Sequence, residues 1–101
     1  MEFLVQFQLD IPDGVPESVV NDRKMAEDAA AKSLADHGIL LRLWNTPTGS
    51  GPTRVLGIYQ AGSEVELESF LVALPLYEWM RTSITALAQH PNDPPRIRAT
   101  A

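Results

Sequence analysis

The stretch that decides the fold is PESVVNDRKMAEDAAAKSLADHG, residues 16–38, and it predicts one long helix. Its interior is rich in alanine, the best helix former. The proline and the glycine at its two ends are favoured at the start and just past the end of a helix. Val20 and Leu34 share one apolar face, and Glu27 lies midway between them on that face. A carboxylate in the middle of a stripe that faces the core requires a structural or functional explanation.

The segments around this helix predict four strands and a second helix. Residues 2–10 alternate apolar and polar side chains, as in a half-buried strand. A capping box starts the second helix at residue 63, and Pro75 ends it. Gly57 interrupts one strand, which indicates that another group approaches the backbone closely there. The predicted strands are residues 2–10, 39–44, 54–60 and 82–90.

The resulting order β-α-β-β-α-β predicts an α+β, ferredoxin-like sandwich, in which an antiparallel sheet carries both helices on one face. The other face of the sheet carries Leu4 and further apolar residues. In a single chain these would be exposed, so they favour pairing with a second sheet, as in a dimeric α+β barrel. We predict one domain over residues 1–91 and a polar, proline-rich tail over residues 92–101.

Composition excludes several classes of function. The net charge of −5 argues against a nucleic-acid partner, which would require a basic face. Cysteine is absent, which excludes disulfides, thiolate catalysis and zinc–cysteine sites. The two histidines do not have the spacing of a metal-binding motif. The sequence contains no Gly-x-Ser-x-Gly motif, which disfavours a hydrolase. The longest apolar run, residues 70–77, is far shorter than the roughly 20 residues of a membrane span. We expect a cytoplasmic protein, since no signal for secretion is recognisable.

Five short motifs, in order and at near-constant spacing, resemble the muconolactone isomerase (muconolactone delta-isomerase) family over nearly the whole chain. They are FLVQF at residues 3–7, Arg23-x-x-x-Glu27, HGxLxRLW at residues 37–44, LPLYxxM at residues 74–80, and His90-Pro91. The resemblance implies a ferredoxin-like domain that pairs through its sheets and builds homo-oligomers, often decamers. It also implies isomerisation of an unsaturated lactone by movement of a proton, without a metal or an organic cofactor. The setting would be degradation of aromatic compounds through the β-ketoadipate route.

Several positions depart from the better-known members of that family. Gln6 stands where those members carry lysine, and Arg42 stands where they often carry histidine. Thr53 and Val55 replace a tyrosine and an asparagine, and the loop at residues 46–52 is about three residues longer. Because these positions would shape the pocket, the exact lactone stays open.

Glu27 is the candidate catalytic residue, as a general base and then a general acid. Partial burial raises the pKa of a carboxyl group toward neutrality, which suits both roles. The structural alternative is an ion pair with Arg23, one helical turn away. Arg23, Arg42 and Arg54 are candidates to bind an acidic lactone, since a guanidinium group grips carboxylates bidentately. Trp44 is a candidate pocket wall, although such residues are also common in cores and interfaces.

Two other functions remain open. The first is a non-catalytic ligand-binding or assembly domain on the same scaffold, which would have its cleft filled by Met25, Trp44 and Leu56. The second is a dehalogenating relative that acts on chlorinated muconolactones with the same base. An open cavity beside Glu27 would favour an enzyme.

Overall fold

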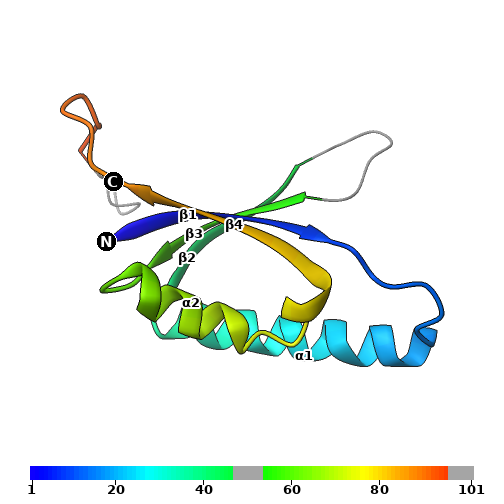
Figure 1. The fold of residues 1–101 in the computed structure, drawn as a ribbon. Coiled ribbons are helices and arrows are strands. Elements are labelled where there is room, and N and C mark those ends of the chain that lie inside the picture. Colours follow the sequence, from blue (N-terminus) through cyan, green and yellow to red (C-terminus); the bar gives the residue numbers. More distant parts are fainter. Residues whose placement is uncertain (47–53, 96–101) are drawn as a thin grey trace.

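Four strands form one antiparallel sheet in the order β2-β3-β1-β4, and both helices cover the same face of it (Figure 1). The structure is a computed structural model that describes residues 1–46 and 54–95. The predicted ferredoxin-like order is confirmed. The elements are β1 (Glu2–Leu9), α1 (Glu17–Asp36), β2 (Leu40–Thr46), β3 (Arg54–Gln60), α2 (Glu64–Val72), the 3-10 helix η1 (Tyr77–Trp79) and β4 (Met80–Leu87).

Helix α1 occupies the predicted stretch. Pro16 is its N-cap, and the Pro16 carbonyl accepts hydrogen bonds from the N–H groups of Val19 and Val20 at 3.0 and 3.1 Å. Gly38 follows the helix with a φ of 73°, a left-handed conformation that favours glycine. The predicted inward stripe is confirmed, because the partly buried residues of α1 are Val20, Arg23, Glu27, Ala30, Ala31 and Leu34.

The strand register explains where two predicted strands were wrong. Strand β4 covers Met80–Leu87 rather than residues 82–90, because its partner β1 pairs Leu9 with Met80 at one end and Glu2 with Leu87 at the other. Strand β2 covers Leu40–Thr46 rather than residues 39–44. The N–H of Ile39 donates to Leu34 O at 2.9 Å and so completes the end of α1.

The core lies between the inner face of the sheet and the two helices. Its most buried side chains come from β1 and α2, where Phe3, Val5, Leu67 and Leu71 are at most 1% exposed. The predicted capping box of α2 is present, since Ser63 Oγ accepts a hydrogen bond from the backbone N–H of Glu66 at 3.1 Å. Neither the 20-residue α1 nor any other helix in the described ranges combines the length and apolarity needed to cross a membrane.

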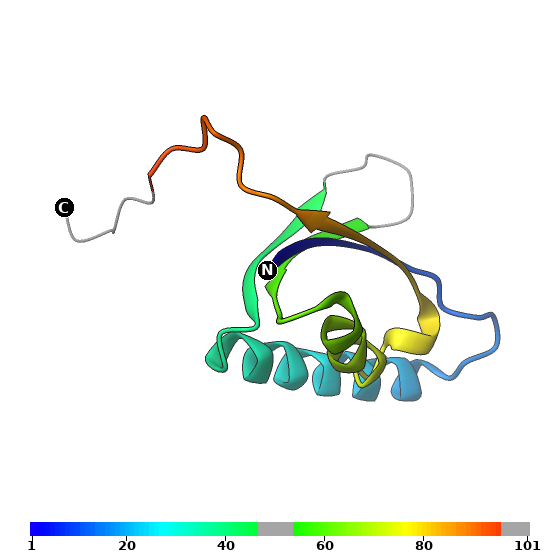
Figure 2. The same ribbon diagram turned by 60° about the vertical axis from the view of Figure 1, so that its left-hand side comes forward.

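No helix or strand in residues 1–46 and 54–95 covers the outer face of the sheet (Figure 1). Leu4, Leu56 and Ile58 lie on this face in the two central strands, because Leu4 pairs with Ile58 and Val5, on the opposite face, is fully buried. Beyond β4, the chain to residue 95 leaves the body of the molecule (Figure 2). The rest of the predicted tail lies outside the described residues.

Candidate functional site

A cavity of about 170 Å³ lies between α1 and the inner face of the sheet. It is far smaller than the roughly 300–1,000 Å³ of pockets for drug-sized ligands, so it suits one small ring. Most of its walls are apolar, as expected of a small-molecule site. The lining residues are Phe7, Leu9, Glu27, Asp28, Ala31, Leu43, Val55, Tyr59, Leu74, Leu76 and Met80.

Glu27 is held in the cavity wall by a hydrogen bond from a distant part of the chain. Its Oε1 accepts from the backbone N–H of Leu76 at 3.0 Å, which joins α1 to the turn between α2 and β4. That amide needs an acceptor because α2 has already ended. Leu74 N–H still bonds to Leu71 O, whereas Pro75 has no N–H at all. The hydrogen bond therefore fixes the carboxylate at the cavity.

The surroundings of Glu27 favour its protonated form. Burial raises the pKa of Glu27 above the ordinary value of 4.5, the Leu76 hydrogen bond opposes this, and the charge of Asp28 adds to it. A carboxyl group with a raised pKa accepts and returns a proton near neutral pH more readily than an exposed one. The cavity thus contains a group suited to moving a proton between carbon atoms.

Tyr59 is a cavity residue that the sequence analysis missed. Its ring lies over Gly57, where a Cβ atom would be only 2.6 Å from Tyr59 Cε1. The predicted close approach to Gly57 is therefore confirmed, and the approaching group is a side chain of the same strand. Burial, together with the nearby charge of Glu27, raises the pKa of Tyr59 to about 12. The sequence signal that could have identified it is an inward-facing tyrosine two residues after a glycine in the same strand, Gly57 and Tyr59.

Arg23 lies one turn from Glu27 but contacts other groups. It forms a salt bridge with Glu78, donates a hydrogen bond to Pro75 O at 3.3 Å, and lies 4.6 Å from the centre of the Trp79 ring. The Arg23–Glu27 ion pair is therefore not the explanation for the inward carboxylate. Arg23 instead ties α1 to the same turn that holds Glu27.

The structure does not bring Arg42, Trp44 and Arg54 to the Glu27 cavity. The register places all three on the outer face of the sheet, where the Arg42 guanidinium lies 4.7 Å from the centre of the Trp44 ring. Arg42 and Arg54 are separated by the Trp44–Leu56 pair, so they do not form one guanidinium cluster. The predicted fillers Met25, Trp44 and Leu56 do not line the cavity.

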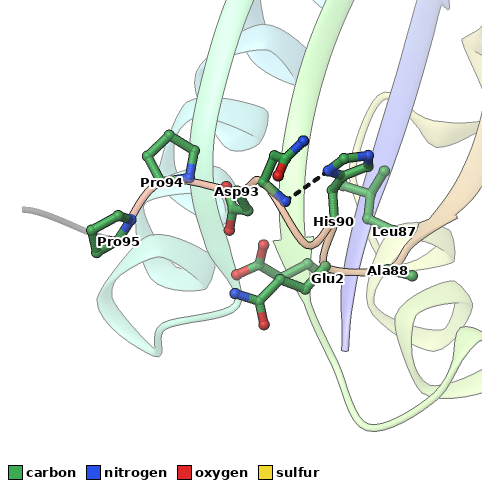
Figure 3. A pocket seen from close by; sticks show the side chains of 9 residues that line it. Glu2, Leu87, Ala88, His90, Asp93, Pro94 and Pro95 are labelled. Carbon is green, nitrogen blue, oxygen red and sulfur yellow. Dashed lines mark hydrogen bonds between the residues drawn. The ribbon is translucent and has the colours of Figure 1, made fainter.

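Two other hollows lie away from Glu27. One of about 720 Å³ lies between Glu2 and the segment after β4, where His90 Nδ1 accepts a hydrogen bond from the Asn92 N–H at 2.9 Å (Figure 3). Another of about 190 Å³ lies near Arg54 and Arg81. Within residues 1–46 and 54–95, no cluster of three or more histidine, aspartate or glutamate side chains is arranged to hold a metal ion.

Comparison with known proteins places this geometry in context. The model of the muconolactone delta-isomerase family matches residues 1–93. Muconolactone Delta-isomerase from Cupriavidus pinatubonensis is 32% identical over 92 residues, covering 91% of this chain and 97% of that protein. Muconolactone Delta-isomerase 1 from Acinetobacter lwoffii is 30% identical, with coverages of 91% and 93%.

Solved structures share the fold. A crystal structure of muconolactone isomerase superposes with a TM-score of 0.79 at 24% identity, covering 92% of this chain and 94% of that one. A 5-chloro-2-hydroxyhydroquinone dehydrochlorinase from Burkholderia phenoliruptrix gives a TM-score of 0.67 at 21% identity, with coverages of 93% and 100%. At these identities, the two structures establish a common architecture.

Proposed function

The chain belongs to the muconolactone delta-isomerase family, and we propose that it isomerises muconolactone or a close relative to the enol-lactone during degradation of aromatic compounds. The observation that carries the proposal is the half-buried carboxyl group of Glu27 in the wall of a small apolar cavity. A cytoplasmic setting, as predicted from the sequence, is part of this proposal.

The reaction requires one base that serves two carbon atoms. Glu27 takes the proton from the ring carbon γ to the carbonyl, and the electron pair moves through the double bond onto the carbonyl oxygen. The resulting dienolate takes the same proton back from Glu27 at the α carbon, which leaves the double bond between the β and γ carbons. A group whose pKa is raised by burial suits both steps.

The carboxylate of the substrate requires a partner at the edge of the cavity. None of the described residues that line the cavity is basic. Arg23 is the one predicted substrate-binding residue on the helix side of the sheet, and we keep it as the candidate for this carboxylate. The outer-face positions of Arg42, Trp44 and Arg54 suit a subunit interface better than a contact with substrate.

The proposed function is tested by following muconolactone with the purified protein in D₂O by proton NMR. We expect conversion to the enol-lactone, and deuterium at the α carbon wherever Glu27 exchanges its proton with solvent before returning it. A protein that binds muconolactone without converting it, or that converts neither it nor related butenolides, would contradict the proposal.

We also propose that the protein is a homo-oligomer that pairs through the outer faces of its sheets. Leu4, Leu56 and Ile58 present a partly exposed apolar surface there, beside Trp44, which is 43% exposed. Replacing Ile58 with glutamate should weaken pairing by at least tenfold, because a charge would be buried in an apolar contact. Sedimentation at several protein concentrations measures this change.

The matched control is Val65→Glu, because Val65 is 77% exposed on α2 and lies on the helical side of the molecule. This variant should assemble like the unmodified protein. A monomeric unmodified protein, or equal weakening by both substitutions, would rule out pairing through the outer face.

A further inference from the structure

We propose that Tyr59 is a second catalytic residue of the cavity, and that its hydroxyl donates a hydrogen bond to the carbonyl oxygen of the bound lactone. The proposal rests on the proposed function, which it deepens by assigning the group that stabilises the dienolate. Three observations support it: the position of the ring, the composition of the cavity, and a hydroxyl with no acceptor among the described residues.

The position of the Tyr59 ring is fixed. Tyr59 is 3% exposed, and its ring lies over the open backbone of Gly57 rather than standing upright on the sheet. The Phe7 ring packs against it edge to face, with centroids 6.2 Å apart and planes at 67°. Leu43 lies beside the same glycine, since its Cδ1 would be 3.3 Å from a Cβ atom on Gly57. Phe7, Leu43 and Tyr59 all line the cavity together with Glu27.

The cavity offers few polar groups. Apart from Glu27, only Asp28 and Tyr59 among the described lining residues carry polar side chains, and Asp28 is exposed. Glu27 and Tyr59 are thus the two functional groups that an enclosed ligand would meet. One is an acceptor of protons when ionised, and the other is a donor of hydrogen bonds.

The Tyr59 hydroxyl has no acceptor among the described residues. It is not sealed in the core either, because Thr82 Oγ1 is the one fully buried side-chain polar atom without a partner in the described part of the chain. Because the Tyr59 pKa is raised to about 12, the phenol keeps its proton throughout the neutral range. The charge of Glu27 acts on Tyr59 from nearby, but the two side chains form no hydrogen bond. The hydroxyl is therefore available to a ligand carbonyl in the cavity.

This role fits the movement of charge in the reaction. When Glu27 removes the γ proton, its negative charge passes to the carbonyl oxygen of the lactone. A fixed hydrogen bond to that oxygen is stronger for the dienolate than for the neutral carbonyl, and this difference lowers the barrier. Tyr59 keeps its proton, and the proton held by Glu27 is the one returned to the α carbon.

The test is Tyr59→Phe, which removes one oxygen atom and keeps the ring. We expect kcat to fall by about 10²–10³-fold, as for loss of one oxyanion donor, with a much smaller change in KM. The matched control is Tyr77→Phe, because Tyr77 is 36% exposed and does not line the cavity. Activity of Tyr59→Phe within threefold of the unmodified protein would overturn the proposal.

A second measurement does not depend on turnover. A but-2-enolide with two methyl groups at its γ carbon offers no proton to Glu27, and its carbonyl stretch reports hydrogen bonding directly. Infrared difference spectra of the bound probe should show a lower stretching frequency in the unmodified protein than in Tyr59→Phe. An identical frequency in both would refute the hydrogen bond, whereas a shift without any isomerase activity would refute only the proposed function.

Discussion

Glu27→Gln is expected to lower kcat for lactone isomerisation by about 10²–10⁴-fold, the range typical of a lost general base. Glutamine has nearly the same shape and still offers a carbonyl oxygen to the Leu76 N–H, which lies 3.0 Å from Glu27 Oε1. The turn between α2 and β4 should therefore stay in place. What the variant lacks is a group that accepts the γ proton. Steady-state kinetics with muconolactone measures the loss.

The matched control is Asp22→Asn. Asp22 is an exposed acidic residue on the same helix, and it does not line the cavity. Its replacement removes one negative charge from α1, as Glu27→Gln does, and should leave kcat unchanged within twofold. If Glu27→Gln also retained turnover within a few-fold, another group would have to be the base.

The difference in stability between the unmodified protein and Glu27→Gln should depend on pH, and the pKa of Glu27 gives its sign. Burial raises the pKa of Glu27 in the folded state above 4.5, so the folded chain binds this proton more tightly than the unfolded chain. Stability from this group is therefore fully present below pH 4.5 and is lost as pH rises through the folded pKa. Glu27→Gln should match or exceed the unmodified protein in thermal stability at pH 7, and its advantage should vanish at pH 4. The acid limb of kcat/KM should likewise lie above pH 4.5.

The fold was predictable because each element carried its own local signal. The capping box at Ser63, the glycine after α1 and the alternation of residues 2–10 are short-range patterns, and each is present in the structure. The strand ends were less predictable. The end of β4 at Leu87 is set by where its partner β1 begins, and a pairing between distant segments leaves no mark in the strand itself.

The candidate site was predictable only where helical phase determined it. Phase placed Glu27 on the inward stripe of α1, and the cavity lies there. Phase also suggested Arg23 as its partner, but the guanidinium meets Glu78 and Trp79, which lie more than 50 residues away in the chain. Arg42 and Arg54 were predicted from their charge alone, and charge does not say which face of a sheet a residue occupies.

The second large effect concerns stability, and it comes from Leu67 at the centre of α2. Leu67 is fully buried in the core beside Phe3, Val5 and Leu71. Leu67→Ala should lower the free energy of unfolding by about 2–5 kcal/mol, because it removes buried methyl groups and leaves a hole that rigid neighbours do not fill. Against a typical total of roughly 5–15 kcal/mol, this loss is large for a domain of 101 residues.

Val65→Ala is the matched control for Leu67→Ala, because Val65 is on the same helix and is 77% exposed. It should change the free energy of unfolding by less than about 0.5 kcal/mol. Urea titrations at one fixed protein concentration measure both variants, since association would make apparent stability depend on concentration. An equal loss in both would contradict the prediction, because alanine is the best helix former and the two variants differ chiefly in the burial of the side chain that they shorten. A larger loss at Leu67 would mean that burial anchors α2, and with it the Leu76 amide that holds Glu27 at the cavity.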